Sequence, residues 1–365
     1  MLKIGYITSE PADNIKIWSG TTKYIYDILK KQYNVENIVI TNSLSGKFLH
    51  VILYKLFHID SPKLNQFFIN KAIKHHRKEI ESCDTLFLSA HSEILGSKNF
   101  QFKNKKIIYL SDATYHLLMQ YYNLSDSKNL KKINEMNEFE SIKKATDIIY
   151  ASDWAKRDAI HHYNANSSKI SVIPFGANLK DEYRPRQYNN HKKRINLLLV
   201  GVEWKRKGID IAIETVKILN RSSSNIHYHL TVVGVNSNKH FKDVNIVGRL
   251  DKSNSDDLKK LIDLYQNSDI FILPTKAECA GIVFCEASMF GLPSVTYNTG
   301  GISSYIKNGK NGFLLDKSSK ANDFAKKINE IVTSGQLSKI QETSRKEYEE
   351  RLNWNSWIKK TSKLL

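Results

Sequence analysis

Two glutamates in the stretch 271–316 are spaced so that they could hold one ligand from two sides. Glu278 and Glu286 are separated by seven residues, and Gly281 lies between them where a helix is predicted to begin. Gly281 would let the backbone approach a ligand closely, and the first N–H groups of the helix, from Ile282 onward, favour an anion. The pattern suits a molecule with hydroxyls at both ends and phosphates in the middle, such as a nucleotide-sugar. Glu278 would then accept from hydroxyls of the sugar and Glu286 from those of the ribose.

The segments around these glutamates extend the pattern. We expect a buried strand over 271–273, a helix over 282–290 and a second strand over 293–297. Two glutamates at this spacing arise often by chance. Here they come with P-T-x-x-E, with E-A-S-x-x-G-L-P-S-V and with T-G-G-I-S-S-Y-I-K-N-G-x-N-G-F-L. With these motifs the chain resembles the family 4 glycosyltransferases, retaining enzymes of GT-B fold whose signature is Glu-x7-Glu. One departure is Ala280, because the family usually has an aromatic residue there.

Two cations lie in another loop of the second half. Arg206 and Lys207 follow a buried strand and precede a helix expected from about Ile209. They could neutralise the charge that grows on a diphosphate as the sugar leaves. By itself such a loop is more typical of surface charge. The resembling family has an arginine after the strand's glycine, where this chain has Val202; Lys207 keeps the family's lysine position and Arg206 could compensate.

The resemblance also implies a nucleobase site. In the family, the turn after the strand at 244–250 holds the base through its backbone. Gly248, Arg249 and Leu250 occupy that turn in this sequence. They are therefore the candidate base-binding residues.

Three further candidates lie in the first half, which opens as strand, loop with Gly20, and helix. No G-x-G-x-x-G accompanies this unit, so a dinucleotide-dependent enzyme is disfavoured. In the resembling family the first loop lies over the donor phosphates or against the acceptor; an ordinary tight turn is equally compatible. His91 and Asp112 follow two predicted strands, and residues past the carboxyl ends of parallel strands point into a ligand crevice. The resemblance places Asp112 first and His91 second as a contact to the transferred sugar, and a structural role is as compatible for each.

Size, composition and charge limit the classes of function. The 365 residues suffice for two domains, and 41% hydrophobic with 25% charged residues is globular. Three cysteines without a C-x-x-C pair argue against a disulfide scaffold or a zinc site. The net charge of +18 indicates an anionic partner or a lysine-rich solvated surface. A nucleic-acid-binding protein is disfavoured, because no basic cluster interleaved with stacking aromatics appears.

One basic segment admits two interpretations. The apolar run FLHVILYKLFHI at 48–59 precedes a segment at 71–78 with six basic residues, Lys71, Lys74, His75, His76, Arg77 and Lys78. Such a stretch could rest on an anionic membrane surface. An ordinary core helix followed by a solvated one fits slightly better. The chain shows no secretory signal and no apolar run of 18 residues, so a cytoplasmic location is expected, with peripheral membrane contact as an option.

The predicted architecture is two Rossmann-like domains facing across a cleft, an α/β protein of GT-B type. We expect an acceptor domain over 1–178, a linker over 179–194, a donor domain over 195–345, and a C-terminal helix over 346–365 that crosses back to the first domain. The resemblance implies a retaining glycosyltransferase that moves a hexose or N-acetylhexosamine from a UDP- or GDP-sugar, with UDP favoured. The acceptor would be a cell-envelope glycan, glycolipid or glycoprotein. No metal or other cofactor is expected. The alternative is a nucleotide-sugar epimerase or a binding module without catalysis.

Overall fold

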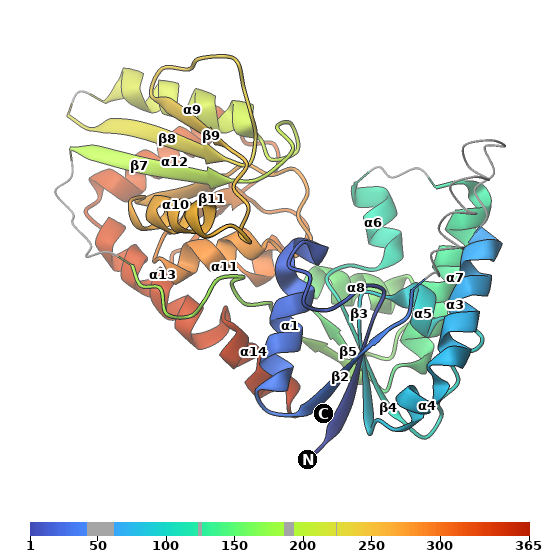
Figure 1. Cartoon of the computed structure of the whole chain (residues 1–365). Coiled ribbons are helices and arrows are strands. Elements are labelled where there is room, and N and C mark those ends of the chain that lie inside the picture. The colour runs from blue at the N-terminus through green and yellow to red at the C-terminus, as the bar shows by residue number, and fades with distance from the viewer. Residues whose placement is uncertain (42–61, 123–125, 186–192, 224) are drawn as a thin grey trace. The chain divides into compact units, whose positions relative to one another are not determined.

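The computed structural model describes residues 1–41, 62–122, 126–185, 193–223 and 225–365. The chain divides into two compact units, drawn in Figure 1. Unit 1 is Met1–Ile173 together with Ile358–Leu365, and unit 2 is Pro174–Trp357. Each unit contains one six-stranded sheet whose strands all pair in parallel, with helices on both faces. The expected α/β class is confirmed, and the end of the chain, Ile358–Leu365, belongs to unit 1.

Unit 1 has the strand order β2-β1-β3-β4-β5-β6. Its strands are β1 (Lys3–Thr8), β2 (Asn34–Val39), β3 (Thr85–Ser89), β4 (Lys106–Ser111), β5 (Asp147–Tyr150) and β6 (Ile170–Val172). Its helices are α1 (Thr21–Lys30), α3 (Pro62–His75), α4 (Arg77–Glu81), α5 (Ser92–Leu95), α6 (Tyr115–Tyr121), α7 (Lys128–Lys144) and α8 (Asp153–His161), with short 3-10 turns η1 (Ile17–Gly20) and η2 (Ser167–Lys169). β3 is buried along its whole length, because helices cover both faces of a parallel sheet.

Unit 2 has the strand order β12-β11-β10-β7-β8-β9. Its strands are β7 (Arg194–Val200), β8 (His227–Val233), β9 (Val244–Gly248), β10 (Ile270–Leu273), β11 (Ser294–Tyr297) and β12 (Gly312–Leu315). Its helices are α9 (Ile209–Ser222), α10 (Ser255–Gln266), α11 (Ile282–Met289), α12 (Ala321–Thr333) and α13 (Leu337–Arg351), with the 3-10 turn η3 (Ile302–Ser304); α14 (Trp354–Thr361) runs on into unit 1. Every residue of β10 and β11 is buried, as the apolar runs in the sequence predict.

The order of the strands fixes where loops can meet. In unit 2 the chain order reverses between β7 and β10, which pair through Ile270 with Leu197 and Phe271 with Leu198. Ligands of open α/β sheets bind at such a reversal, beyond the carboxyl ends of the strands. The loops that follow β7 and β10 therefore begin side by side, and they contain both the cations and the first glutamate of the predicted site. In unit 1 the reversal lies between β1 and β3.

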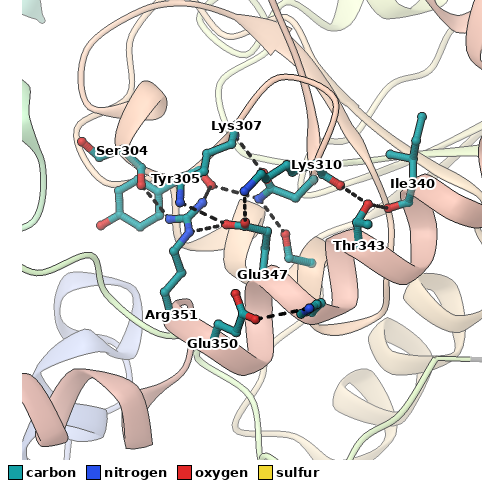
Figure 2. Close-up of polar contacts among 12 residues, drawn as sticks. Ser304, Tyr305, Lys307, Lys310, Ile340, Thr343, Glu347, Glu350 and Arg351 are labelled. Carbon is teal, nitrogen blue, oxygen red and sulfur yellow. Dashed lines mark hydrogen bonds and ion pairs between the residues drawn. The ribbon is translucent and has the colours of Figure 1, made fainter.

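Hydrogen bonds and ion pairs connect α13 to the turn before β12, as Figure 2 shows. The carboxylate of Glu347 is hydrogen-bonded to Arg351 Nε and lies 3.6 Å from Lys307 Nζ and 3.8 Å from Lys310 Nζ. Arg351 also donates from Nη1 to the Ser304 carbonyl at 2.8 Å and from Nη2 to the Tyr305 carbonyl at 2.7 Å. Only 7% of the Glu347 side chain is exposed. One arginine thus satisfies a buried carboxylate and two backbone carbonyls at once.

One predicted helix is absent from the described residues, and one segment of interest lies outside them. The segment at 299–304 predicts a helix that begins at Thr299, Gly300 and Gly301, but the structure has only the short 3-10 turn at Ile302–Ser304. The apolar run at 48–59 lies outside the described residues, whereas the basic segment after it is described as the end of α3 and α4. None of the helices that the structure describes is long and apolar enough to cross a membrane.

Candidate active site

The loops after β7 and β10 are in direct contact. The N–H of Lys276 donates to the carbonyl of Arg206 at 2.8 Å. Gly208, the residue before α9, has φ of 68°, and a Cβ added there would lie 2.1 Å from the carbonyl oxygen of Pro274. Only glycine fits this position, because both the backbone conformation and the space exclude a side chain. The close approach sets the side chains of the two loops against each other.

Lys207 and Arg206 meet at the carboxylate of Glu278. Lys207 Nζ donates a hydrogen bond to Glu278 Oε2, and Arg206 Nη1 lies 4.0 Å from the same oxygen. Arg206 is held by two other bonds, from Nη1 to the Ala277 carbonyl at 2.9 Å and from Nη2 to Glu203 Oε1 at 2.6 Å. The hydrogen bond from Arg206 lowers the pKa of Glu203. The structure therefore brings together three predicted catalytic residues from two loops.

Gly201, the residue directly after β7, positions the side chain of Lys207. Only 8% of the Lys207 side chain is exposed, and a Cβ added at Gly201 would lie 3.0 Å from Lys207 Cγ. The stem of the lysine thus packs against the bare backbone at the end of β7. This packing directs the ammonium toward Glu278. The arginine that the resembling family has after this glycine is absent, since Val202 follows Gly201 here.

The helix that follows Glu278 begins where predicted. Gly281 has φ of 61° and precedes α11, whose first residue is Ile282. A Cβ at Gly281 would lie 2.6 Å from Phe284 Cδ2 and 3.2 Å from Glu278 Cγ. The first N–H groups of a helix have no partner inside it, so this end of α11 can receive an anion. The backbone carbonyl of Glu278 accepts from the N–H of Gly301 at 3.1 Å, which ties the loop to the next one.

Glu286 lies at the centre of a second network. Its side chain is fully buried on α11, with Oε1 bonded to Lys252 Nζ and Oε2 accepting from the Tyr265 hydroxyl at 3.0 Å. Burial, and then the charge of Glu286, raise the pKa of Tyr265 well above its usual range. Tyr265 therefore keeps its proton and donates to the carboxylate. Each oxygen of Glu286 retains acceptor capacity for a ligand hydroxyl.

Lys252 and Tyr265 were not among the residues selected from the sequence. Lys252 also donates to the carbonyl of Asn178 at 3.4 Å, and a quarter of its side chain is exposed. No spacing rule links position 252 to position 286, and the fold alone pairs them. The only available signal was the charge of Glu286 itself, since a buried carboxylate requires a cation or hydrogen-bond donors.

The pairing of Lys252 with Glu286 predicts a coupled stability effect. We expect Lys252→Met to lower the free energy of unfolding by about 2 kcal/mol, because it leaves a buried carboxylate without its cation. The double variant Lys252→Met/Glu286→Gln should recover most of that loss. Chemical denaturation of the two single variants and the double variant measures the coupling. Purely additive losses would show that the pair is not an energetic unit.

The predicted base-binding turn lies on the same segment as Lys252. Gly248 ends β9 with φ of 87°, and its carbonyl accepts from the N–H of Gly234 at 2.7 Å. Arg249 is exposed and Leu250 is half-buried. Lys252 is two residues beyond Leu250, so its bond to Glu286 anchors the far end of the turn. A role in base binding stays a prediction.

The three candidates of unit 1 lie around the carboxyl ends of β1, β3 and β4. Gly20, with φ of 88°, precedes α1, and Trp18 two residues earlier donates from Nε1 to Asp112 Oδ2 at 3.2 Å. His91 Nδ1 lies 3.0 Å from Glu93 Oε1, while its Nε2 accepts from the N–H of Ser9 at 3.3 Å. The structure thus joins the Gly20 loop to Asp112 directly and brings His91 to the loop after β1. Contact of any of the three with a sugar stays a prediction.

Two parallel α/β units, with a cation and carboxylate site at the strand reversal of the second, match the architecture expected for the GT-B fold. The particular assignment comes from sequence. Residues 180–349 match the family model described as "Glycosyl transferases group 1". This segment is therefore similar to a group 1 glycosyltransferase domain, and it contains the candidate site residues of unit 2.

Known proteins with similarity to the chain agree with this assignment. The chain is 26% identical to D-inositol 3-phosphate glycosyltransferase of Arthrobacter over 230 residues, which cover 58% of the chain and 54% of that protein. It is 28% identical to the capsular polysaccharide biosynthesis glycosyltransferase CapM of Staphylococcus aureus over 227 residues, or 57% and 58% of the two chains. The chain thus spans about half the length of the curated relatives that it matches.

A solved structure shares the fold over the whole chain. HepE of Anabaena, crystallised in complex with UDP, superposes with a TM-score of 0.66 at 16% identity, covering 100% of this chain and 99% of that one. At this level of identity the similarity shows the shared fold. It does not transfer a ligand or a reaction.

Proposed function

We propose that the chain is a retaining glycosyltransferase that transfers a sugar, a hexose or N-acetylhexosamine, from a UDP-sugar to a hydroxyl of a cell-envelope acceptor. The observation that supports this most is the convergence of Lys207 and Arg206 on Glu278 at the start of α11. It sets two cations and a helix N-terminus where a diphosphate would leave, next to a carboxylate that could accept from sugar hydroxyls.

The nucleoside would lie near Glu286 and its partners Lys252 and Tyr265. Glu286 would accept hydrogen bonds from ribose hydroxyls, and the turn of Gly248, Arg249 and Leu250 would border the base. We propose UDP as the first nucleotide to test, and a protein of the same fold, HepE, was crystallised with UDP. A GDP-sugar is the second candidate donor.

In the proposed reaction the bond between the sugar and the diphosphate breaks while an acceptor hydroxyl attacks from the same face. The acceptor proton passes to the leaving diphosphate oxygen, so that no protein base is required. Lys207, Arg206 and the N–H groups at Gly281 would stabilise the negative charge that develops on the diphosphate. Asp112 and His91 are proposed as unit 1 contacts to the transferred sugar.

We propose that these cations replace a divalent metal ion in the reaction. Glycosyl transfer should then persist in a chelator that strips divalent metals. The acceptor class is proposed from the relatives, whose names refer to inositol phosphate and to capsular polysaccharide. Glycan, glycolipid and glycoprotein acceptors are all compatible with the site.

A thermal-shift screen against UDP, GDP, ADP, CMP and their sugar conjugates tests the donor site. A nucleotide at 100 times its dissociation constant stabilises the native state by about 2.7 kcal/mol, which should raise the melting temperature by roughly 5 °C. We expect UDP and a UDP-sugar to give this shift and Glu286→Ala to abolish it. The control Glu342→Ala removes an exposed glutamate of α13 and should keep the full shift. No shift with any nucleotide would contradict the transferase proposal.

The second candidate function is a nucleotide-sugar epimerase or a binding module, because the same site would hold the same ligand. NMR of the stabilising UDP-sugar, incubated with the protein without acceptor and then with acceptor, distinguishes a transferase, an epimerase and a binding module. An epimerase would convert the sugar to its epimer, and a binding module would leave it unchanged even when acceptor is supplied.

A further inference from the structure

Helix α7 buries three polar side chains and one large apolar side chain, Ile142, and it exposes two large apolar side chains. Asn137, Glu138 and Ser141 are buried, and Glu138 accepts from the Tyr109 hydroxyl at 3.0 Å. On the outer side, Met136 is 55% exposed and Phe139 is 41% exposed. A helix on a protein surface normally has the reverse arrangement. Folding of unit 1 therefore does not explain why apolar side chains occupy the outer face.

Lysines flank these apolar residues on the same face of α7. Lys128, Lys132 and Lys143 are exposed, and their spacing from Met136 and Phe139 follows the steps of three and four residues that define one helix face. Two acidic residues border this face: Glu135, which accepts from the Tyr163 hydroxyl at 2.6 Å, and Glu140, which is half-buried. The face is thus apolar at its centre and cationic toward both ends of the helix.

Helix α3 shows the same combination. Phe67 is 60% exposed, and Lys71, Lys74 and Lys78, also exposed, continue its face into the start of α4. Among the ion pairs of the described residues, none involves these three lysines or the three of α7, whereas Glu79 and Glu81 are paired with His76 and Arg77. Among the described residues, none of these six ammonium groups has a carboxylate partner, so all six can bind an external anion.

The two helices are neighbours. Residues of α3 contact residues of α7, and α5 packs against both; Figure 1 shows α3, α5 and α7 together in unit 1. Of the five large apolar side chains that are exposed in the described part of the chain, three are Phe67, Met136 and Phe139. Their concentration on two adjacent helices distinguishes them from the singly scattered apolar residues of an ordinary surface.

We infer that the outer faces of α3 and α7 form a docking surface for an anionic lipid bilayer. Apolar side chains would enter the boundary between headgroups and acyl chains, and the lysines would bind the anionic headgroups around them. The charge pattern favours a membrane over a second copy of the chain, since two copies would oppose cations to cations. The inference is independent of the proposed reaction.

Co-sedimentation of the full chain with large vesicles tests the surface. We expect binding to vesicles of phosphatidylcholine with 30% phosphatidylglycerol, and little binding to phosphatidylcholine alone. Met136→Ser/Phe139→Ser and Lys71→Glu/Lys74→Glu should each lower the partition coefficient at least about tenfold. The control Lys239→Glu/Lys242→Glu reverses the same amount of charge on exposed residues of unit 2 and should leave binding within about threefold of the native value. Melting curves check that each variant is folded.

Three results would overturn the inference. The first is that the native chain does not sediment with anionic vesicles. The second is that the unit 2 control loses as much vesicle binding as the α3 and α7 variants. The third is that the lysine variant loses binding while Met136→Ser/Phe139→Ser does not. The last would show attraction by charge without insertion of the apolar residues. Sedimentation velocity without lipid adds one more check, because a dimer abolished by Met136→Ser/Phe139→Ser would assign the surface to a second copy.

Discussion

Replacement of Lys207 by alanine should lower the turnover number about 100- to 1,000-fold while the donor still binds. That is the usual effect of removing one preorganised group that stabilises charge in the transition state. Lys207 is suited to this role because its stem is fixed against Gly201 and its ammonium is bonded to Glu278. Arg206, 4.0 Å from the same carboxylate oxygen, would supply the residual activity.

The turnover number is measured as the release of UDP from whichever UDP-sugar stabilises the protein most in the thermal-shift screen. Lys205→Ala is the matched control, because Lys205 lies in the same loop but is exposed. We expect the control to keep turnover within about twofold of the native value. An increase in KM with an unchanged turnover number would mean that Lys207 contributes only to ground-state binding, which would contradict the proposed role.

The fold, and the cluster of Lys207, Arg206 and Glu278, could be predicted from sequence because the sequence signals for them are local. The buried strand at 270–273, the glycine before α11 and the two glutamates lie within one short stretch, and the loop of Arg206 and Lys207 follows the first strand of unit 2. Parallel strands then bring such loops together at one edge of the sheet. The contacts between Lys207, Arg206 and Glu278 follow from this topology once the two strands are known to be neighbours.

The residues that were missed depend on contacts between segments far apart in sequence. Lys252 reaches Glu286 from the turn after β9, and Trp18 reaches Asp112 across 94 residues. Neither lysine nor tryptophan has a spacing signature for such a role. The outward apolar face of α7 was also missed, because Met136 and Phe139 follow a periodicity that sequence alone assigns to a core. The helix predicted to begin at Thr299 was wrong, because η3 ends at Ser304 and the carbonyls of Ser304 and Tyr305 accept from Arg351 of α13.

Replacement of Arg351 by methionine should lower the free energy of unfolding by about 3 kcal/mol at neutral pH. Removing one partner of a buried ion pair leaves the other charge uncompensated, and here the variant also removes the hydrogen bonds from Arg351 to the carbonyls of Ser304 and Tyr305. Lys307 and Lys310, at 3.6 Å and 3.8 Å, remain beside Glu347 and keep the loss from being larger. Lys346→Met, which breaks the exposed pair with Glu350 on the same helix, is the control and should cost less than about 0.5 kcal/mol.

The pH dependence separates the ion pair from the other bonds of Arg351. Burial acts to raise the pKa of Glu347, but the hydrogen bond and charge of Arg351 and the charges of Lys307 and Lys310 outweigh it and hold the pKa below its usual value. A depressed carboxyl pKa stabilises the native state fully above the pKa of the unfolded chain, and this stabilisation is lost as the pH falls through the folded pKa. Urea denaturation measures the free energy of unfolding of the native protein and of Arg351→Met. The difference between the two should be largest near pH 7 and should decrease below about pH 4.5. The difference should not vanish, because the two carbonyl bonds are lost at every pH. A difference independent of pH would assign the whole effect to those carbonyls and none to Glu347.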